Sequence, residues 1–238
     1  MNRWCGSCIE RLQAAPFRRE FATHASVREA NGGFASPSAP FRPLDDSTRN
    51  RLLTSVKKVL GGKTLRVFAY GSLLWRPCYP ISRQISAHAK GFAATMCVWT
   101  VSARGSVENP GLGLGLIEAR STAYGALIES EPAHNDAALE ALWAREMLTG
   151  CYRPAWIRVS TVEGEQEALA FVVDAAHLQF AGHLSMAQQA ALVEKARGEL
   201  GSNLEYVEQT AAKLAAEGYR NRELEELLML IRAKRTTP

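Results

Sequence analysis

The chain has 238 residues, of which 47% are hydrophobic, and its formal charge is +4. This length can bury one sizeable core and leaves one or two domains open. The longest apolar runs, around Val67 and Ala168, are far shorter than the roughly 20 residues that a helix needs to cross a bilayer, which argues against a membrane protein. Residues 1–60 carry ten Lys/Arg against five Asp/Glu, so the remainder is nearly neutral and no nucleic-acid surface is expected.

The cysteines are odd in number and irregular in spacing: Cys5, Cys8, Cys78, Cys97 and Cys151. This pattern argues against a disulfide framework and favours a reducing compartment, the cytoplasm. The first two form a single C-x-x-C with no second pair and no neighbouring histidine. Because the histidines also lack ligand spacing, no metal site is predicted.

Three segments follow one another along the chain. Residues 1–45 are expected to be a leader and linker with little regular structure, because residues 31–45 concentrate Gly, Ser and Pro. A short helix leading into the fold is expected within residues 46–63, with Asp46 at its N-cap and Gly61-Gly62 at its end. Residues 64–236 are expected to form one folded domain.

From Leu65 onward the pattern is typical of β-strands, which we expect at 65–70, 93–102, 113–118, 124–128, 156–161 and 167–173. One helix is expected between the fourth and fifth of these strands, at 133–148. After Ser185 the chain should be helical to its end. Because strands and helices do not alternate regularly, the sequence predicts an α+β fold with a mixed, largely antiparallel sheet.

The glycines at 111, 113 and 115 do not form a dinucleotide-binding fingerprint. Leu116 stands where the third glycine of that motif is needed, and a strand-like run follows instead of a helix. Glycines at every second position of a strand instead predict that another backbone or a ligand approaches one face of the sheet closely.

The helix expected at 133–148 carries a carboxylate where its apolar stripe should continue. Leu139, Leu142 and Trp143 define the stripe, and Glu146 is its next position. Burying an unpaired carboxylate is costly and raises its pKa, so such a residue is usually paired with a cation or used for proton transfer. Glu146 is therefore a candidate acid/base residue.

A structural salt bridge with Arg153 or Arg158 is the alternative role for Glu146. Arg145 is not expected to be its partner, because adjacent side chains on a helix do not face each other, and it should point to solvent or the helix edge. Gly150 should end the helix, which leaves the carboxylate in the last turn, near the mouth of a loop.

A second feature is the strand LRVFAYGSLLW, which runs directly into Gly71-Ser72. Glycine allows a sharp turn, and the amides after it can point outward together as donors to an anion or an oxyanion. An ordinary strand-ending turn is the alternative. Ser72 is not predicted to be a nucleophile, because it lies outside a G-x-S-x-G motif and no triad order is visible.

Five segments, in the same order, resemble the ChaC-type γ-glutamylcyclotransferases. They correspond to the family's Y-G-S-L loop, its R-G-x-x-x-x-P-G segment, its W-G-V-A-Y strand, its R-E helix followed by G-Y, and its N-x-E-Y segment. In this chain they read VFAYGSLLWRP (67–77), SARGSVENPGLGLGL (102–116), AYGALI (123–128), ALWAREMLTGCYRP (141–154) and GSNLEYV (201–207). The similarity covers about residues 64–216, and Trp99–Ser102 departs from the aromatic-Gln-Gly-Ser run of the animal members.

The resemblance implies a γ-glutamylcyclotransferase-like fold, with a mixed sheet or small barrel, flanking helices and a helical C-terminus. It makes residues 64–236 the catalytic domain and Glu146 the catalytic acid/base, and it implies no metal and no organic cofactor. Arg104 becomes a candidate partner for the glycyl carboxylate, with an ion pair as its alternative, and Tyr206 is expected to line the site. The substrate-binding strand and loop implied by the resemblance are Val67, Phe68, Ala69, Tyr70, Gly71, Ser72 and Leu73.

The activity implied by the resemblance is that of a lyase that cleaves glutathione to 5-oxoproline and cysteinylglycine, with a small molecule as its partner. Tyr70 would orient the amine or cap the pocket, with simple packing as its alternative. Two other functions stay open: a cyclotransferase for another γ-glutamyl amine or peptide, and a catalytically silent binding or regulatory module. Glu146 beside an intact Tyr70–Leu73 loop argues against the silent module.

Overall fold

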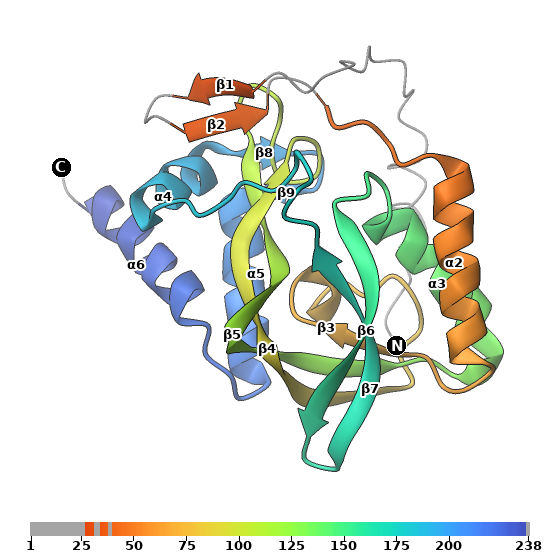
Figure 1. The fold of residues 1–238 in the computed structure, drawn as a ribbon. Helices are drawn as coiled ribbons and strands as arrows, with labels where there is room; N and C mark the ends of the chain where they lie inside the picture. Colours follow the sequence, from red (N-terminus) through yellow and green to blue (C-terminus); the bar gives the residue numbers. More distant parts are fainter. Residues whose placement is uncertain (1–26, 31–33, 38–39, 237–238) are drawn as a thin grey trace.

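A closed barrel lies at the centre of the computed structural model, which describes residues 27–30, 34–37 and 40–236 (Figure 1). The strands follow one another around the barrel in the order β3-β5-β4-β6-β7. Their bounds are β3 (Arg66–Ala69), β4 (Arg83–Thr100), β5 (Gly111–Glu129), β6 (Tyr152–Thr161) and β7 (Gly164–Val173). The structure therefore confirms the predicted α+β class and small barrel.

Most pairings in the barrel are antiparallel. The long hairpin β4–β5 is paired from Arg83↔Glu129 to Thr100↔Gly111, with register shifts between residues 90 and 92 and between 96 and 98. The hairpin β6–β7 is antiparallel as well. Strand β3 pairs antiparallel with β5 and parallel with β7, and this parallel contact closes the barrel. The sheet is thus mixed and largely antiparallel, as predicted.

Three strand predictions were wrong in extent. The strands expected at 113–118 and 124–128 are one continuous strand, β5, and the strand expected at 93–102 begins much earlier, at Arg83. Polar and mostly exposed residues at 118–122 interrupt the apolar pattern that the sequence shows. The two ends of this stretch nevertheless pair with β4, Glu118 with Phe92 and Thr122 with Lys90, and the first register shift lies between them. Because ladder hydrogen bonds do not depend on side-chain polarity, the strand continues on both sides of the shift.

Five α-helices and two short 3₁₀ helices accompany the barrel in the described part of the chain. The α-helices are α2 (Asp46–Leu60), α3 (Asn135–Glu146), α4 (Met186–Lys195), α5 (Asn203–Ala216) and α6 (Arg222–Thr236), and the 3₁₀ helices are η1 (Ser72–Leu74) and η2 (Pro132–His134). Helices α4, α5 and α6 make the predicted helical C-terminus. Two short pairs, β1 (Val27–Ala30) with β2 (Phe34–Pro37) and β8 (Arg197–Gly198) with β9 (Gly201–Ser202), complete the fold.

Helix α2 ends where the sequence predicts, and it begins one residue before its predicted start. Its N-cap is Asp45 and not Asp46: the Asp45 side chain accepts a hydrogen bond from the amide of Thr48 at 2.9 Å. Gly61 ends the helix in the left-handed conformation, with φ of 55°. The expected leader lies mostly outside the described residues, as do Cys5 and Cys8.

Helix α2 and the segment before it pack beside α3 (Figure 1). Arg49 donates to the carbonyl oxygen of Trp143 at 3.2 Å, and the indole of Trp143 donates to the carbonyl oxygen of Arg49 at 3.1 Å. The amide of Leu44 donates to the carbonyl oxygen of Leu148 at 2.9 Å, and the Leu44 side chain lies against Gly150. Residues 40–60 thus cover α3 and the loop that follows it.

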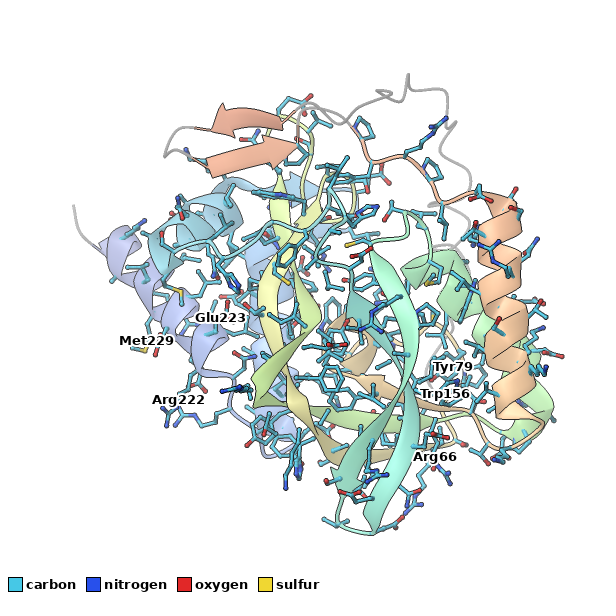
Figure 2. All side chains as sticks on the ribbon, viewed as in Figure 1. Arg66, Tyr79, Trp156, Arg222, Glu223 and Met229 are labelled. Carbon is cyan, nitrogen blue, oxygen red and sulfur yellow. The ribbon has the colours of Figure 1, made fainter. Side chains whose placement is uncertain are left out.

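Helix α6 is held to the barrel by a half-buried polar contact. Glu223 accepts hydrogen bonds from the Thr95 hydroxyl at 2.8 Å and from the Met96 amide at 3.3 Å, and it points toward β4, whereas Arg222 and Met229 lie on the outer side of α6 (Figure 2). Within the described residues, no helix has both the length and the apolar character that crossing a membrane would require.

The glycines of β5 allow close packing by the protein itself. A Cβ at Gly111 would lie 2.7 Å from the carbonyl oxygen of Arg104, and one at Gly115 would lie 2.6 Å from a methyl group of Val173. Real Cβ contacts are essentially never shorter than 3.0 Å. The expected close approach by another backbone is therefore confirmed at Gly111.

Candidate active site

Glu146 is the last residue of α3, and its side chain is 15% exposed. The helix buries the stripe of Leu139, Leu142 and Trp143, and the next residue after the helix, Met147, is fully buried. The period of the helix therefore turns Glu146 toward the protein interior. Neither Arg153 nor Arg158 pairs with it, because Arg153 binds Glu118 and Arg158 binds Glu165, so the two partners suggested for a salt bridge of Glu146 are wrong.

Arg145 is the cation beside Glu146, which corrects the expectation that it would point to solvent. Its Nε lies 3.2 Å from Oε1 of Glu146. Its Nη2 donates to the Ser72 hydroxyl at 2.7 Å, and its Nη1 donates to the carbonyl oxygen of Arg76 at 2.5 Å. The rule against adjacent pairs describes Cβ directions on a helix, whereas the guanidinium lies several bonds further out and can reach round. Arg145 thus joins Glu146 to the loop after β3.

That loop is a short 3₁₀ turn, η1, which directly follows Tyr70-Gly71. The amide of Leu74 donates to the carbonyl oxygen of Gly71, and the amides of Trp75 and Arg76 donate to that of Ser72. The amides of Ser72 and Leu73, at the start of the turn, have no hydrogen-bond acceptor among the described residues. Only part of the predicted row of outward amides is therefore open to a ligand.

Two tyrosines lie beside this turn, and the hydroxyl groups of both form hydrogen bonds. Tyr70 donates to the carbonyl oxygen of Phe171 at 2.7 Å, and the Tyr206 hydroxyl accepts from the amide of Leu114 at 3.0 Å. A Cβ at Gly71 would lie 3.5 Å from the Tyr206 hydroxyl, so Tyr206 stands directly beside the loop. Burial raises the pKa of Tyr206 to about 12 and that of Tyr70 well above its usual range, which keeps both neutral.

The electrostatics of the site centre on Glu146. Burial raises the pKa of its carboxyl group, and the Arg145 guanidinium opposes that rise. Although burial is the main cause of the raised pKa in four nearby groups, the negative charge of Glu146 also raises the pKa of each. They are Tyr70, Cys78, Tyr152 and Tyr206. The carboxylate therefore lies within electrostatic range of these neutral hydroxyl and thiol groups, and its one ion pair among the described residues is with Arg145.

Arg104 forms the ion pair that was considered as its alternative role. Its side chain is 8% exposed, and its Nη1 lies 2.8 Å from Oε2 of Glu205 and 3.2 Å from the carbonyl oxygen of Ser202. The guanidinium also lies 5.5 Å from the ring centroid of Trp75. The Glu205 amide binds the Ser202 side chain as a cap requires, but the Glu205 carboxylate binds Arg104 and Gln209.

Among the described residues, the other thiols and acids give no second centre. Burial raises the pKa of Cys97 and of Cys151 to about 12, so both thiols stay protonated and are poor nucleophiles. Among residues 27–30, 34–37 and 40–236, no three His, Cys, Asp or Glu side chains lie close enough together to hold a metal ion.

Residues 65–234 match the family model described as ChaC-like protein. The chain belongs to the ChaC-like family. Curated relatives include a glutathione-specific γ-glutamylcyclotransferase of Escherichia coli K12, 29% identical over 168 residues that cover 70% of this chain and 72% of that protein. The glutathione-specific γ-glutamylcyclotransferase 1 of Homo sapiens is 27% identical over 149 residues, which cover 61% of this chain and 67% of the human protein.

A solved structure of a yeast γ-glutamyl cyclotransferase specific to glutathione has a TM-score of 0.66 to this ChaC-like chain. The two are 19% identical, and the match covers 71% of this chain and 96% of the yeast chain. At this level of identity the likeness concerns the fold.

Three residues of this ChaC-like site were not predicted to belong to it: Arg145, Tyr152 and Cys78. Arg145 and Tyr152 lie within the family-like segment 141–154, so the R-E and G-Y motifs already contained the signal. Cys78 follows the first family-like segment by one residue, and no pattern in the sequence indicates its proximity to Glu146.

Proposed function

We propose that this protein is a γ-glutamylcyclotransferase that cleaves glutathione to 5-oxoproline and cysteinylglycine. The observation that carries the proposal is the position of Glu146: a largely buried carboxyl group, joined through Arg145 to Ser72 of the Tyr70-Gly-Ser-Leu73 loop. Membership of the ChaC-like family and the names of the curated relatives support it.

The reaction is an intramolecular acyl transfer. The α-amine of the γ-glutamyl group attacks the side-chain carbonyl carbon of the same residue, a C–N bond forms to close the five-membered lactam, and the original amide C–N bond breaks. Because nucleophile and electrophile share one residue, a folded conformer can supply an effective molarity on the order of 10⁵ M or more. The protein has mainly to hold the substrate in that conformer and to move one proton.

Glu146 is proposed to move that proton. Its carboxylate accepts a proton from the α-amine during attack, and the carboxylic acid returns it to the leaving nitrogen, which departs as the amine of cysteinylglycine. Acid/base help of this kind is worth about 10²–10⁴ in rate. Burial raises the pKa of Glu146, which makes the carboxylate a stronger base than an exposed one.

The strand and loop Val67–Leu73 are proposed to bind the γ-glutamyl group. The free amides of Ser72 and Leu73 would donate to its carboxylate or to the developing oxyanion, and Tyr206 would line the wall beside Gly71. The Tyr70 hydroxyl is held by Phe171, so its ring shapes the pocket and its hydroxyl orients the backbone. Arg104 would bind the glycyl carboxylate only by exchanging its Glu205 partner.

The test is release of 5-oxoproline by the purified protein from glutathione, γ-Glu-Ala and γ-Glu-ε-Lys. Turnover of reduced glutathione is expected, with a loss of at least about a hundredfold in Glu146→Gln, which keeps the shape of the side chain but cannot shuttle the proton. Glu140→Gln, on the exposed face of the same helix, is the matched control and should retain full activity. Full activity in Glu146→Gln would exclude Glu146 as the acid/base.

The same assay separates the alternatives. Preferred turnover of γ-Glu-Ala or γ-Glu-ε-Lys would assign the protein to another γ-glutamyl substrate, and no turnover of any of the three would favour a silent binding module.

We further propose that residues 64–236 form the catalytic unit, that residues 46–63 lead into it, and that the protein acts in the cytoplasm on a small molecule without a nucleic-acid or membrane partner.

A further inference from the structure

Arg145 bridges two parts of the site that come from distant segments of the sequence. One part is the end of α3, where its Nε lies 3.2 Å from Glu146. The other is the turn after β3, where it donates to the Ser72 hydroxyl at 2.7 Å and to the carbonyl oxygen of Arg76 at 2.5 Å. One planar guanidinium presents donors in fixed directions, so these three contacts define the distance between carboxylate and turn.

We propose that Arg145 is a positioning residue that fixes the carboxylate of Glu146 against the turn formed by residues 71–76. The inference rests on the proposed function, because the turn is where the γ-glutamyl group would bind. Arg145 itself has no part in the proton transfer. Its role is to fix the position of the Glu146 carboxylate and to favour its charged state before the substrate reacts.

The surroundings of Glu146 make this role specific to Arg145. The charge of Glu146 also acts on four groups from other segments: Tyr70 directly after β3, Cys78 after η1, Tyr152 in β6 and Tyr206 in α5. All four are neutral near pH 7, since burial raises the pKa of each, to about 11 for Cys78 and about 12 for Tyr206. Arg145 is the one cation found to act on Glu146 in the described part of the chain.

Both partners are shielded from solvent, with side chains 23% and 15% exposed for Arg145 and Glu146. Charges in such a place interact more strongly than on an open surface. Because the guanidinium lowers the pKa of Glu146 against the effect of burial, its removal should raise that pKa. An opposite charge at this range typically shifts a carboxyl pKa by about one to three units.

The competing explanation is that Arg145 has a purely structural role and only connects α3 to the turn. This role would need only the contacts to Ser72 and Arg76, and its loss would lower activity equally at every pH. A positioning residue that also sets the charge state of the base makes the loss depend on pH. The pH profile therefore separates the two.

The first variant, Arg145→Gln, keeps hydrogen-bonding capacity and removes the charge. We expect the acid limb of kcat/KM for glutathione to move up by about one unit or more, so that activity on the acid side falls at least tenfold. Arg158→Gln, which removes an exposed arginine that pairs with Glu165, is the charge-matched control and should not move the limb. A loss of activity that is equal at all pH values, or no loss, would overturn the inference.

The second variant, Arg145→Lys, keeps the charge and loses the fork that reaches three acceptors at once. We expect kcat to fall about tenfold or more while the acid limb stays within about half a unit of the wild type. Wild-type kcat in this variant would show that the geometry of the guanidinium is not needed. This variant also carries the test should Arg145→Gln fail to fold, which thermal unfolding reports.

A readout without turnover keeps this inference separate from the proposed function. The side-chain carboxyls of glutamate are labelled with ¹³C, the Glu146 signal is assigned by its loss in Glu146→Gln, and its titration is compared between wild type and Arg145→Gln. A raised midpoint in the variant supports the role of Arg145 even if glutathione is not a substrate. An unchanged midpoint refutes it even if glutathione is turned over.

Discussion

Gly125 of β5 has no room for a side chain, because it lies against the end of β3. A Cβ at this position would overlap the carbonyl oxygen of Ala69 and would lie 3.0 Å from its carbonyl carbon and 3.1 Å from Cα of Tyr70. Real Cβ atoms do not approach so closely, so in Gly125→Ala the two backbones must separate by about 1 Å. The segment that moves is the one that leads into Ser72.

Two effects should follow from Gly125→Ala. Overpacking of this kind typically costs about 1–3 kcal/mol, and for a domain of this size 1 kcal/mol corresponds to roughly 2–4 °C in Tm. A displacement of about 1 Å at a substrate loop can cost on the order of a hundredfold in rate. We therefore expect a Tm lower by several degrees and kcat/KM for glutathione lower by one to two orders of magnitude.

The control is Gly113→Ala in the same strand. A Cβ at Gly113 would lie 3.6 Å from the carbonyl oxygen of Val98, which is an ordinary contact, so this variant should keep wild-type Tm and kcat/KM. Tm is measured by thermal unfolding, and kcat/KM is measured by 5-oxoproline release. If Gly125→Ala matched the wild type in both, the end of β3 would not be held by β5 as described, and the reasoning would be refuted.

Two further predictions concern stability. Asn203 is fully buried and binds both backbone groups of Leu112: it accepts from the amide and donates to the carbonyl oxygen, at 2.7 Å each. Asn203→Ala should therefore lower the free energy of unfolding in urea by about 2–5 kcal/mol. A loss below about 1 kcal/mol would contradict this. Burial raises the pKa of Glu146 in the folded state, so folding favours its protonated form and this contribution to stability is lost as pH rises from the ordinary range through the raised pKa. Glu146→Gln should therefore become more stable than the wild type as pH rises from 4 to 8. The free energy of unfolding in urea measures this, and a more stable wild type at pH 8 would count against the prediction.

The parts of the site that the sequence predicts are those fixed by local periodicity. The stripe Leu139, Leu142 and Trp143 directs Glu146 inward because a helix repeats every 3.6 residues, whatever packs against it. Gly61 ends α2 because the left-handed conformation suits glycine. The fold class follows in the same way from the succession of strands and helices.

The parts that could not be predicted depend on contacts between distant segments. The spacing of Ser202 and Glu205 fits a capping box, yet the Glu205 carboxylate binds Arg104 from a loop about a hundred residues earlier. Arg145 has a solvent-facing position by helical geometry, yet Ser72 and Arg76 hold its guanidinium. In both cases a long side chain has several possible partners, and the fold decides which one lies within reach.

The place of β3 in the barrel has a consequence for biosynthesis. Val67 pairs with Ile128 and with Leu169, so the strand that precedes the Tyr70-Gly-Ser-Leu73 loop waits for partners made about sixty and about a hundred residues later. At a translation rate of about 5–20 residues per second, the wait on the ribosome is about 3–12 s for Ile128 and about 5–20 s for Leu169. During this interval an apolar strand has unpaired edges, and chaperones or neighbouring nascent chains can bind it. One of the first segments of the domain to be synthesised is thus among the last to become fixed.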